Sequence, residues 1–186
     1  YDYIKTRAEL AVYKEICDYS GFYSQISTAG TYTVFAPVDS AWNNLFGQLK
    51  IKNYKEKAPE YWLMYLKYSA LESQIHTNSL NGGKMTQYTM LDKNYFLSVD
   101  VTSYTAMKLN NSAVIKEYNI ELKNGYLNLI DAVLEPPIQS VYELLKEDGR
   151  FEIMLGLFEK AEMTSYLTDS LITLFDQNFK TLNPTF

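Results

Sequence analysis

The side chains most often used in catalysis are scarce in this chain of 186 residues, which has one histidine, His76, and one cysteine, Cys17. His76 lies in the segment LESQIHTNSL, where no nucleophile or orienting partner is indicated, so we expect a surface histidine. Cys17 falls on an apolar helical stripe, and we expect a buried, inert thiol. A single cysteine also excludes an intrachain disulfide and a zinc site built from several cysteines.

Other motifs that could bind a cofactor or an anion are incomplete. Gly82-Gly83-Lys84 lacks the spacing of a phosphate-binding loop, and we expect a turn before a strand there. We find no pair of carboxylates at a spacing typical of acid–base catalysis. The net charge is −5, which argues against general nucleic-acid binding because that relies on clustered Lys and Arg. We therefore expect a non-catalytic protein with no cofactor, no bound metal and no nucleic-acid partner.

Tyrosines are the best candidates for recognition, because the chain has 17 of them and tyrosine is favoured at binding surfaces. Pro59 suits the first turn of a helix that carries Tyr61, Trp62, Tyr65 and Tyr68. Tyr65 and Tyr68 are expected on its core face, whereas Trp62 lies off that face and is expected to be exposed. Two interpretations remain open: core packing alone, or a platform of Trp62, Tyr61 and Tyr68 for a protein or a glycan.

These side chains need a scaffold, and the segment TYTVFAPVDSAW, residues 31–42, indicates part of it. Residues 31–35 alternate and are rich in β-branched and aromatic types, which predicts a strand. Pro37 lacks an N–H and should end that strand. Asp39 is then well placed as the N-cap of the next helix. The apolar residues of that helix recur at helical spacing: Trp42, Leu45, Phe46 and Leu49.

The C-terminal half of residues 1–137 has a different apolar period. From about residue 83 to 134 the period approaches two, which predicts several strands. Asn110-Asn111 and Lys123-Asn124-Gly125 are hairpin signals between such strands. Residues 127–133 predict a strand that Pro136-Pro137 ends. Helices followed by antiparallel strands predict an α+β fold.

Two distant segments carry a resemblance to a known family. TVFAPVDSAW resembles the first signature motif of the fasciclin (FAS1) domain family, and NGYLNLIDAVLEPP, residues 124–137, resembles the second. Between them, YWLMYLKYSAL resembles the helix and Tyr-His segment of that family, and order and spacing agree over residues 4–137. Two positions differ, because the family's histidines fall here on Ser69 and Asn128. The signature positions that we single out are Thr33, Phe35, Pro37, Asp39, Asn124, Gly125, Ile130 and Asp131.

The resemblance implies a compact β-sandwich or wedge with helices packed beside it, over residues 1–137. Phe35 and Ile130 should then belong to a single core. Asp131 lies in a mostly apolar strand, and a buried carboxylate needs a partner. We expect it to make a structural hydrogen bond to backbone or hydroxyl groups rather than to bind a ligand.

Residues 138–186 are a separate, mostly helical part. Ser140 and Glu143 have the spacing of a capping box. The segment EIMLGLFEKAEMTSYLTD, residues 152–169, aligns with AVYKEICDYSGFYSQIST, residues 11–28, and residues 173–175 align with 33–35 after a shift of one. Two interpretations remain open: an incomplete second fasciclin-type repeat, or a helical extension of the first domain. Since an incomplete repeat cannot close its own core, we expect it to lean on the first domain or on another chain, which allows an oligomer.

The resemblance implies a non-catalytic, extracytoplasmic adhesion or binding module whose partner is an unidentified protein or glycan at the cell surface. The alternative is a glycan-binding accessory protein of a bacterial surface nutrient-uptake system. The lack of disulfides and a composition rich in Lys, Asn and Tyr favour a bacterial envelope location, with a lipid anchor in a segment outside this chain. No apolar run reaches the roughly 18 residues of a membrane span.

Overall fold

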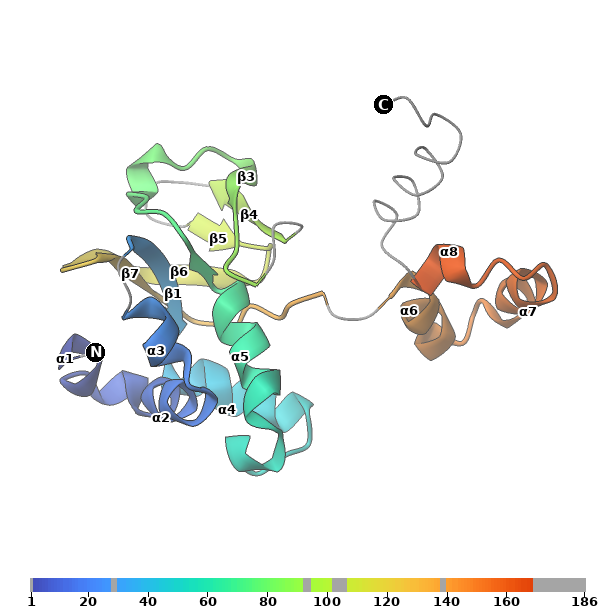
Figure 1. Ribbon diagram of the computed structural model, residues 1–186, viewed down its shortest axis with the longest axis horizontal. Helices are drawn as coiled ribbons and strands as arrows, with labels where there is room; N and C mark the ends of the chain where they lie inside the picture. The colour runs from blue at the N-terminus through green and yellow to red at the C-terminus, as the bar shows by residue number, and fades with distance from the viewer. Residues whose placement is uncertain (1, 28–29, 92–94, 102–106, 138–139, 169–186) are drawn as a thin grey trace. The chain divides into compact units, whose positions relative to one another are not determined.

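A computed structural model of the chain describes residues 2–27, 30–91, 95–101, 107–137 and 140–168. The chain divides into two compact units, Tyr1–Pro136 and Pro137–Phe186, and each is described by itself (Figure 1).

The first unit begins with helices. Gly21 has φ +71°, a left-handed conformation that glycine adopts without strain, so one helix ends there and the next begins at once. Pro59 occupies the first turn of the helix that was predicted from it. The helices are α1 (Asp2–Lys5), α2 (Ala11–Ser20), α3 (Phe22–Ile26), α4 (Asp39–Gln48) and α5 (Pro59–Tyr68), with short 3-10 turns η1 (Ala8–Leu10), η2 (Tyr54–Glu56) and η3 (Thr77–Ser79).

The strands of this unit form one mixed sheet of seven in the order β2-β1-β7-β6-β5-β4-β3. They are β1 (Tyr32–Pro37), β2 (Ala70–Leu71), β3 (Gly83–Tyr88), β4 (Phe96–Val101), β5 (Met107–Leu109), β6 (Ala113–Leu122) and β7 (Gly125–Ile130). β1 and β7 run parallel, whereas the other neighbours are antiparallel. Both predicted hairpins are present, and Asn110 and Asn111 have the positive φ values that a tight turn requires. The predicted α+β fold is confirmed.

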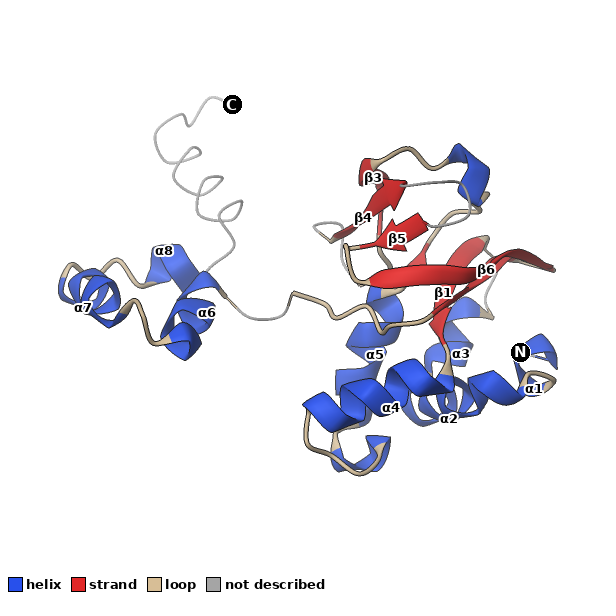
Figure 2. Cartoon of the chain, turned by 180° about the vertical axis from the view of Figure 1, so that it is seen from behind, coloured by secondary structure: helices blue, strands red, loops and turns tan. Residues whose placement is uncertain are grey.

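The sheet curves until its two outer strands meet. Leu71 in β2 forms an isolated bridge with Thr89, which directly follows β3. One apolar cluster lies inside the curve and contains Phe35 and Ile130, and a second contains Val34 and Leu127 together with the helices. Figure 2 shows α2, α4 and α5 gathered on one side of the strands. Because side chains alternate along a strand, β1 and β7 serve both clusters, so Phe35 and Ile130 share a core as expected.

The structure corrects the role predicted for Asp39. The N-cap of α4 is Val38, and Asp39 is the first residue of the helix. Its carboxylate accepts a hydrogen bond from the backbone N–H of Val12 at 2.9 Å, so it serves α2 instead of its own helix. Pro37 is the last residue of β1, as predicted.

The second unit is helical over the residues that the structure describes. It contains α6 (Val141–Asp148), α7 (Glu152–Lys160) and α8 (Ser165–Thr168). The capping box predicted from Ser140 and Glu143 is present in both directions at the start of α6. The predicted match of residues 173–175 lies outside the described residues.

Candidate functional site

A pocket of about 770 Å³ opens where α1 and α3 approach the start of β1 and the turn between β6 and β7. This volume falls in the range of sites that hold a small ligand or a few side chains. Its floor is made by buried residues, which include Ile4, Tyr13, Val34 and Leu127. Its rim is exposed and polar, and it includes Asp2, Asp18, Ser24 and Lys123.

The first residues of the second signature motif shape one wall of this pocket. The backbone N–H of Tyr32 donates to the carbonyl of Asn124 at 2.8 Å, and the side-chain amide of Asn124 donates to the carbonyl of Ile26 at 2.9 Å. The turn is thereby fastened to both β1 and α3. Gly125 has φ +140°, and a Cβ there would lie 1.7 Å from the carbonyl oxygen of Tyr32, so only glycine fits.

The floor of the pocket is uncharged at neutral pH. Complete burial raises the pKa of Tyr13 well above its ordinary value, and the neighbouring Cys17 adds to that shift. Burial likewise raises the pKa of the Cys17 thiol, which is consistent with the expected inert cysteine. The hydroxyl of Tyr32 donates to the carbonyl of Gln25 at 3.4 Å. Such a floor suits non-covalent binding of an apolar or aromatic group.

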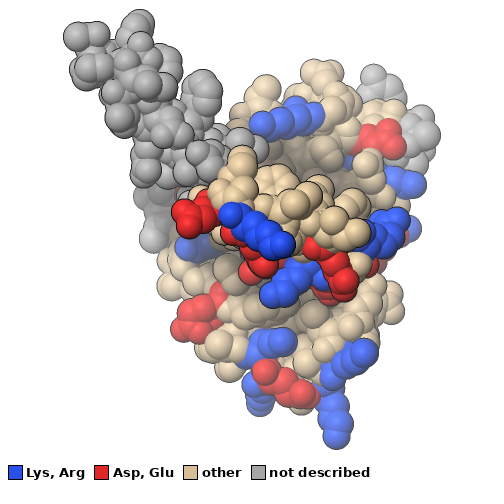
Figure 3. Space-filling view, turned by 90° about the vertical axis from the view of Figure 1, so that its right-hand side faces the viewer, with Lys and Arg blue, Asp and Glu red and all other residues tan. Residues whose placement is uncertain are grey.

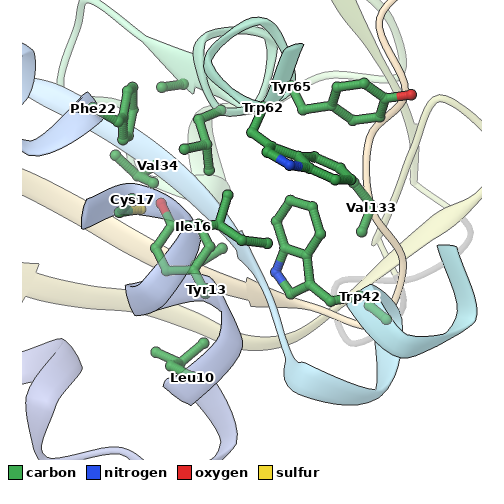
Figure 4. Close-up of a cluster of buried hydrophobic side chains, with 14 of the residues drawn as sticks. Leu10, Tyr13, Ile16, Cys17, Phe22, Val34, Trp42, Trp62, Tyr65 and Val133 are labelled. Carbon is green, nitrogen blue, oxygen red and sulfur yellow. The ribbon is translucent and has the colours of Figure 1, made fainter. Parts of the chain in front are cut away.

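Trp62, expected to be exposed, is fully buried, and that expectation was wrong. Its indole N–H donates to the carbonyl of Tyr54 at 2.7 Å, and its ring lies edge-on to Trp42 with centroids 5.8 Å apart. Figure 4 shows the two indoles next to each other in the core, with Tyr65 and Val133 nearby. The physical reason is that α5 is covered on more than one side, so a residue off its sheet-facing side still packs against α4.

Tyr61 and Tyr68 do not form an exposed platform with Trp62. Tyr68 is buried, and its hydroxyl accepts a hydrogen bond from the side-chain amide of Asn110 at 2.9 Å. Tyr61 is half-buried, and its hydroxyl lies 2.9 Å from that of Tyr65. Burial raises the pKa of Tyr65, with a further contribution from the hydrogen bond to Tyr61. In this structure the aromatic residues of α5 therefore serve mainly the core.

Thr33 and Asp131, two further signature residues, make structural contacts. The hydroxyl of Thr33 donates to the carbonyl of Ser73 at 2.7 Å and accepts from the backbone N–H of Ile75 at 2.8 Å. The Asp131 carboxylate accepts from the backbone N–H of Val114 at 2.8 Å and forms an ion pair with Lys116 at 2.8 Å. These bonds tie the loop after β2 to β1 and the end of β7 to β6.

The two positions at which the family carries histidines lie on either side of Phe35. Asn128 is the register partner of Phe35 in β7, and the backbone N–H of Phe35 donates to the carbonyl of Ser69 at 2.9 Å. Asn128 is fully buried, and its side-chain oxygen accepts from the backbone N–H of Asn119 at 2.8 Å. Here Asn128 links β7 to β6 through its side-chain oxygen. Ser69 contacts β1 only through its backbone carbonyl, and its hydroxyl donates to the carbonyl of Leu66 at 3.0 Å.

The remaining candidates do not join the pocket floor. His76 is exposed, and its Nδ1 accepts from the backbone N–H of Asn78 at 3.3 Å. Lys84 lies in β3 with its ammonium 3.8 Å from the ring centroid of Phe96. Among the described residues, no group of three His, Cys, Asp or Glu side chains could hold a metal ion. Nor does any helix within the described ranges have the length and apolarity needed to cross a membrane.

The charges on the face shown in Figure 3 are mixed. In the space-filling view of Figure 3, lysines and arginines are interspersed with aspartates and glutamates. At the pocket rim, Asp18 forms an ion pair with Lys14 at 2.9 Å and Asp2 lies 3.6 Å from Lys5. Because these pairs are exposed, each contributes little to stability.

Comparison with known proteins agrees with the two signature motifs. The fasciclin domain model matches residues 8–136, more than half of the chain. Human periostin is 26% identical over 148 residues, which are 80% of this chain and 16% of periostin. A solved FAS1 domain pair from the insect cell adhesion molecule fasciclin I superposes with a TM-score of 0.55 at 17% identity, over 87% of this chain and 56% of that one. The chain thus spans about half of that domain pair and a smaller part of periostin, and it belongs to the fasciclin domain family.

Proposed function

We propose that this chain is a non-catalytic adhesion module that acts outside the cytoplasm, and that its pocket between α3 and the β6–β7 turn receives an apolar anchor side chain of a protein partner. The observation that carries this proposal is the pocket itself, with its buried apolar floor and exposed polar rim. Protein interfaces have this anatomy, in which a desolvated anchor supplies most of the affinity and a polar rim surrounds it.

The size and chemistry of the pocket favour an aromatic or branched aliphatic anchor. Tyr13, Val34 and Leu127 offer only apolar contact or a protonated hydroxyl at the floor. The charged side chains of the lining, which are Asp2, Asp18 and Lys123, are all exposed and lie at the rim. An anchor with polar flanking residues would thus bury its apolar part without leaving a charge unpaired.

The comparisons support the class of this function. The insect relative is a cell adhesion molecule, and the family assignment covers the part of this chain that contains the pocket. We extend the proposal to the location of the protein. We propose that it lies at the envelope or surface of a bacterial cell and is held there by a lipid anchor in a segment outside this chain, because the composition favours such a source.

A random peptide library displayed on phage tests the pocket directly. The chain is used as bait, and selected peptides are then measured on two variants. Ser24→Trp places an indole at the pocket rim, whereas Asn43→Trp places one on the exposed side of α4 and serves as the matched control. We expect peptides with an aromatic or aliphatic anchor whose affinity falls at least tenfold on Ser24→Trp and is unchanged on Asn43→Trp.

Two results would overturn the proposal. Peptides that bind Ser24→Trp as well as the unaltered chain would place recognition elsewhere. A library that returns no pocket-dependent peptide would exclude a peptide anchor, and the glycan alternative would then be the better one.

That alternative is favoured by a second, smaller pocket of about 330 Å³ with a polar lining, which includes Asn44, Gln48, Asn110, Asp131 and Glu135. Planar amide and carboxylate groups offer both donors and acceptors to hydroxyl groups. A glycan array separates the two functions. Saturable binding to a glycan that is lost in Asn44→Ala with Gln48→Ala, and retained in Ser24→Trp, would support glycan binding, whereas an empty array would exclude it.

A further inference from the structure

The second unit repeats the backbone of the first helices at a constant offset of 141 residues. In the first unit α2 follows Leu10, which has φ −114° and ψ 18°. In the second unit α7 follows Phe151, which has φ −110° and ψ 17°. After each helix the chain passes through the left-handed region at equivalent positions, Gly21 with φ +71° and Glu162 with φ +55°. A glutamate rarely adopts that conformation. Its occurrence at the position equivalent to Gly21 therefore indicates that the backbone follows the same path in both units.

Hydrogen bonds at the ends of these helices match at the same offset. The backbone N–H of Gly21 donates to Asp18, and that of Glu162 donates to Glu159. Farther along, the N–H of Ser27 donates to Tyr23 at 2.9 Å, and that of Thr168 donates to Thr164 at 3.1 Å. The helices α2 and α3 of the first unit are therefore equivalent to α7 and α8 of the second unit, with no insertion or deletion between them.

Burial differs sharply between the equivalent positions. Ile16 and Phe22 are fully buried in the first unit. Their equivalents Leu157 and Met163 are 63% and 42% exposed, and Ile153, equivalent to the partly buried Val12, is 85% exposed. We call the side formed by Ile153, Leu157 and Met163 the open face.

The first unit shows what such a face packs against. Ile16 and Phe22 belong to one apolar cluster with Val34 of β1 and Leu127 of β7. These strands pair in parallel, with Val34 in register with Leu127. The helical layer of the first unit thus shares one apolar cluster with a parallel strand pair.

We infer that the open face is the packing face of a second fasciclin helical layer, and that the partner it fits is the apolar side of a fasciclin-type parallel strand pair. Leu155 of α7 stands where the first unit has Lys14, and it is buried, whereas the open face is exposed.

A fusion that supplies such a strand pair tests this inference. Residues 28–137 of this chain are appended directly after Thr168, because Thr168 is equivalent to Ser27 and the junction keeps the register of the first unit. We expect the helices of the second unit to complete a second domain. Fluorescence of the dye 8-anilinonaphthalene-1-sulfonate should fall several-fold relative to the unaltered chain, and amide hydrogen exchange over residues 152–160 should slow at least tenfold.

Three further chains make the result decisive. A fusion that carries Leu157→Asp and Met163→Asp should lose the dye and exchange effects while the first unit unfolds as before. A duplicate, in which a second copy of residues 1–137 is appended directly after Thr168, shows that the appended strands can fold. A third fusion carries the first unit's residues on the open face, with Ile153→Val, Leu157→Ile and Met163→Phe.

The inference is overturned when the duplicate folds but two fusions gain no protection from amide exchange over residues 152–160. These are the first fusion and the fusion that carries Ile153→Val, Leu157→Ile and Met163→Phe. It is also overturned when light scattering shows that the unaltered chain is a dimer and that Leu157→Asp dissociates it, because a second copy would then cover the open face.

Discussion

The carboxylate of Asp39, the first residue of α4, accepts a hydrogen bond from the backbone N–H of Val12 in the first turn of α2, at 2.9 Å. The first N–H groups of a helix have no partner within it, and a carboxylate near that end is favoured by the helix dipole. Asp39 therefore joins the first signature motif to the N-terminal helices, and its role depends on a residue 27 positions earlier.

Loss of this contact should lower stability modestly. We expect Asp39→Ala to reduce the free energy of unfolding by about 1 kcal/mol, the typical cost of removing a cap. Asp39→Asn keeps an acceptor oxygen and should cost less. Urea unfolding followed by tryptophan fluorescence measures both variants, and equal losses in the two would show that charge rather than the hydrogen bond matters.

Gly125 and Gly47 should respond oppositely to alanine. At Gly125 an added Cβ meets the Tyr32 carbonyl and the φ value is unsuitable for alanine, so Gly125→Ala should cost more than about 3 kcal/mol or prevent folding. Gly47 lies inside α4 with open space around it, so Gly47→Ala should stabilise by about 0.5–1 kcal/mol. Thermal unfolding by circular dichroism checks the pair, and a tolerated Gly125→Ala would contradict the register of β1 and β7.

Trp62 should contribute to stability and not to surface binding. We expect Trp62→Ala to cost about 3–5 kcal/mol, because a large cavity is left in the core. Tyr61→Ala removes a half-buried ring and should cost less than about 2 kcal/mol. Chemical denaturation of the two variants tests this order, and a smaller loss for Trp62→Ala would show that the indole is not a core residue.

Stability should fall at alkaline pH because of Cys17. Burial raises the pKa of its thiol in the folded state, while in the unfolded chain a cysteine titrates near 8.5. Above that pH the unfolded state loses a proton that the folded state keeps, so unfolding is favoured as pH rises. We expect a loss of about 1.4 kcal/mol between pH 7.5 and 9.5.

The control for this effect is Cys17→Ala, which lacks the thiol. Over the same pH interval its free energy of unfolding should fall by about 1.4 kcal/mol less than that of the unaltered chain. Equal pH dependence in the two chains would show that the thiol is accessible and titrates normally in the folded state.

Local signals in the sequence predicted much of the architecture. Pro37 lacks a backbone donor, so the end of β1 was predictable, and Asn110-Asn111 predicted a hairpin because both residues tolerate positive φ. The capping box at Ser140 followed from spacing alone. The pocket was not predicted, since Ile4, Val34 and Leu127 come from three distant segments and no short motif links them.

By itself, the sequence determined the fasciclin family and the α+β class, with helices followed by antiparallel strands, because each depends on residue types at short spacing. Tertiary structure alone decided that Trp62 is buried, that Asp39 serves α2, and that Leu157 stays exposed where Ile16 is covered. The physical reason is that exposure and hydrogen-bond partners depend on which distant element packs against a residue, and the periodicity of a single helix or strand carries no information about that neighbour.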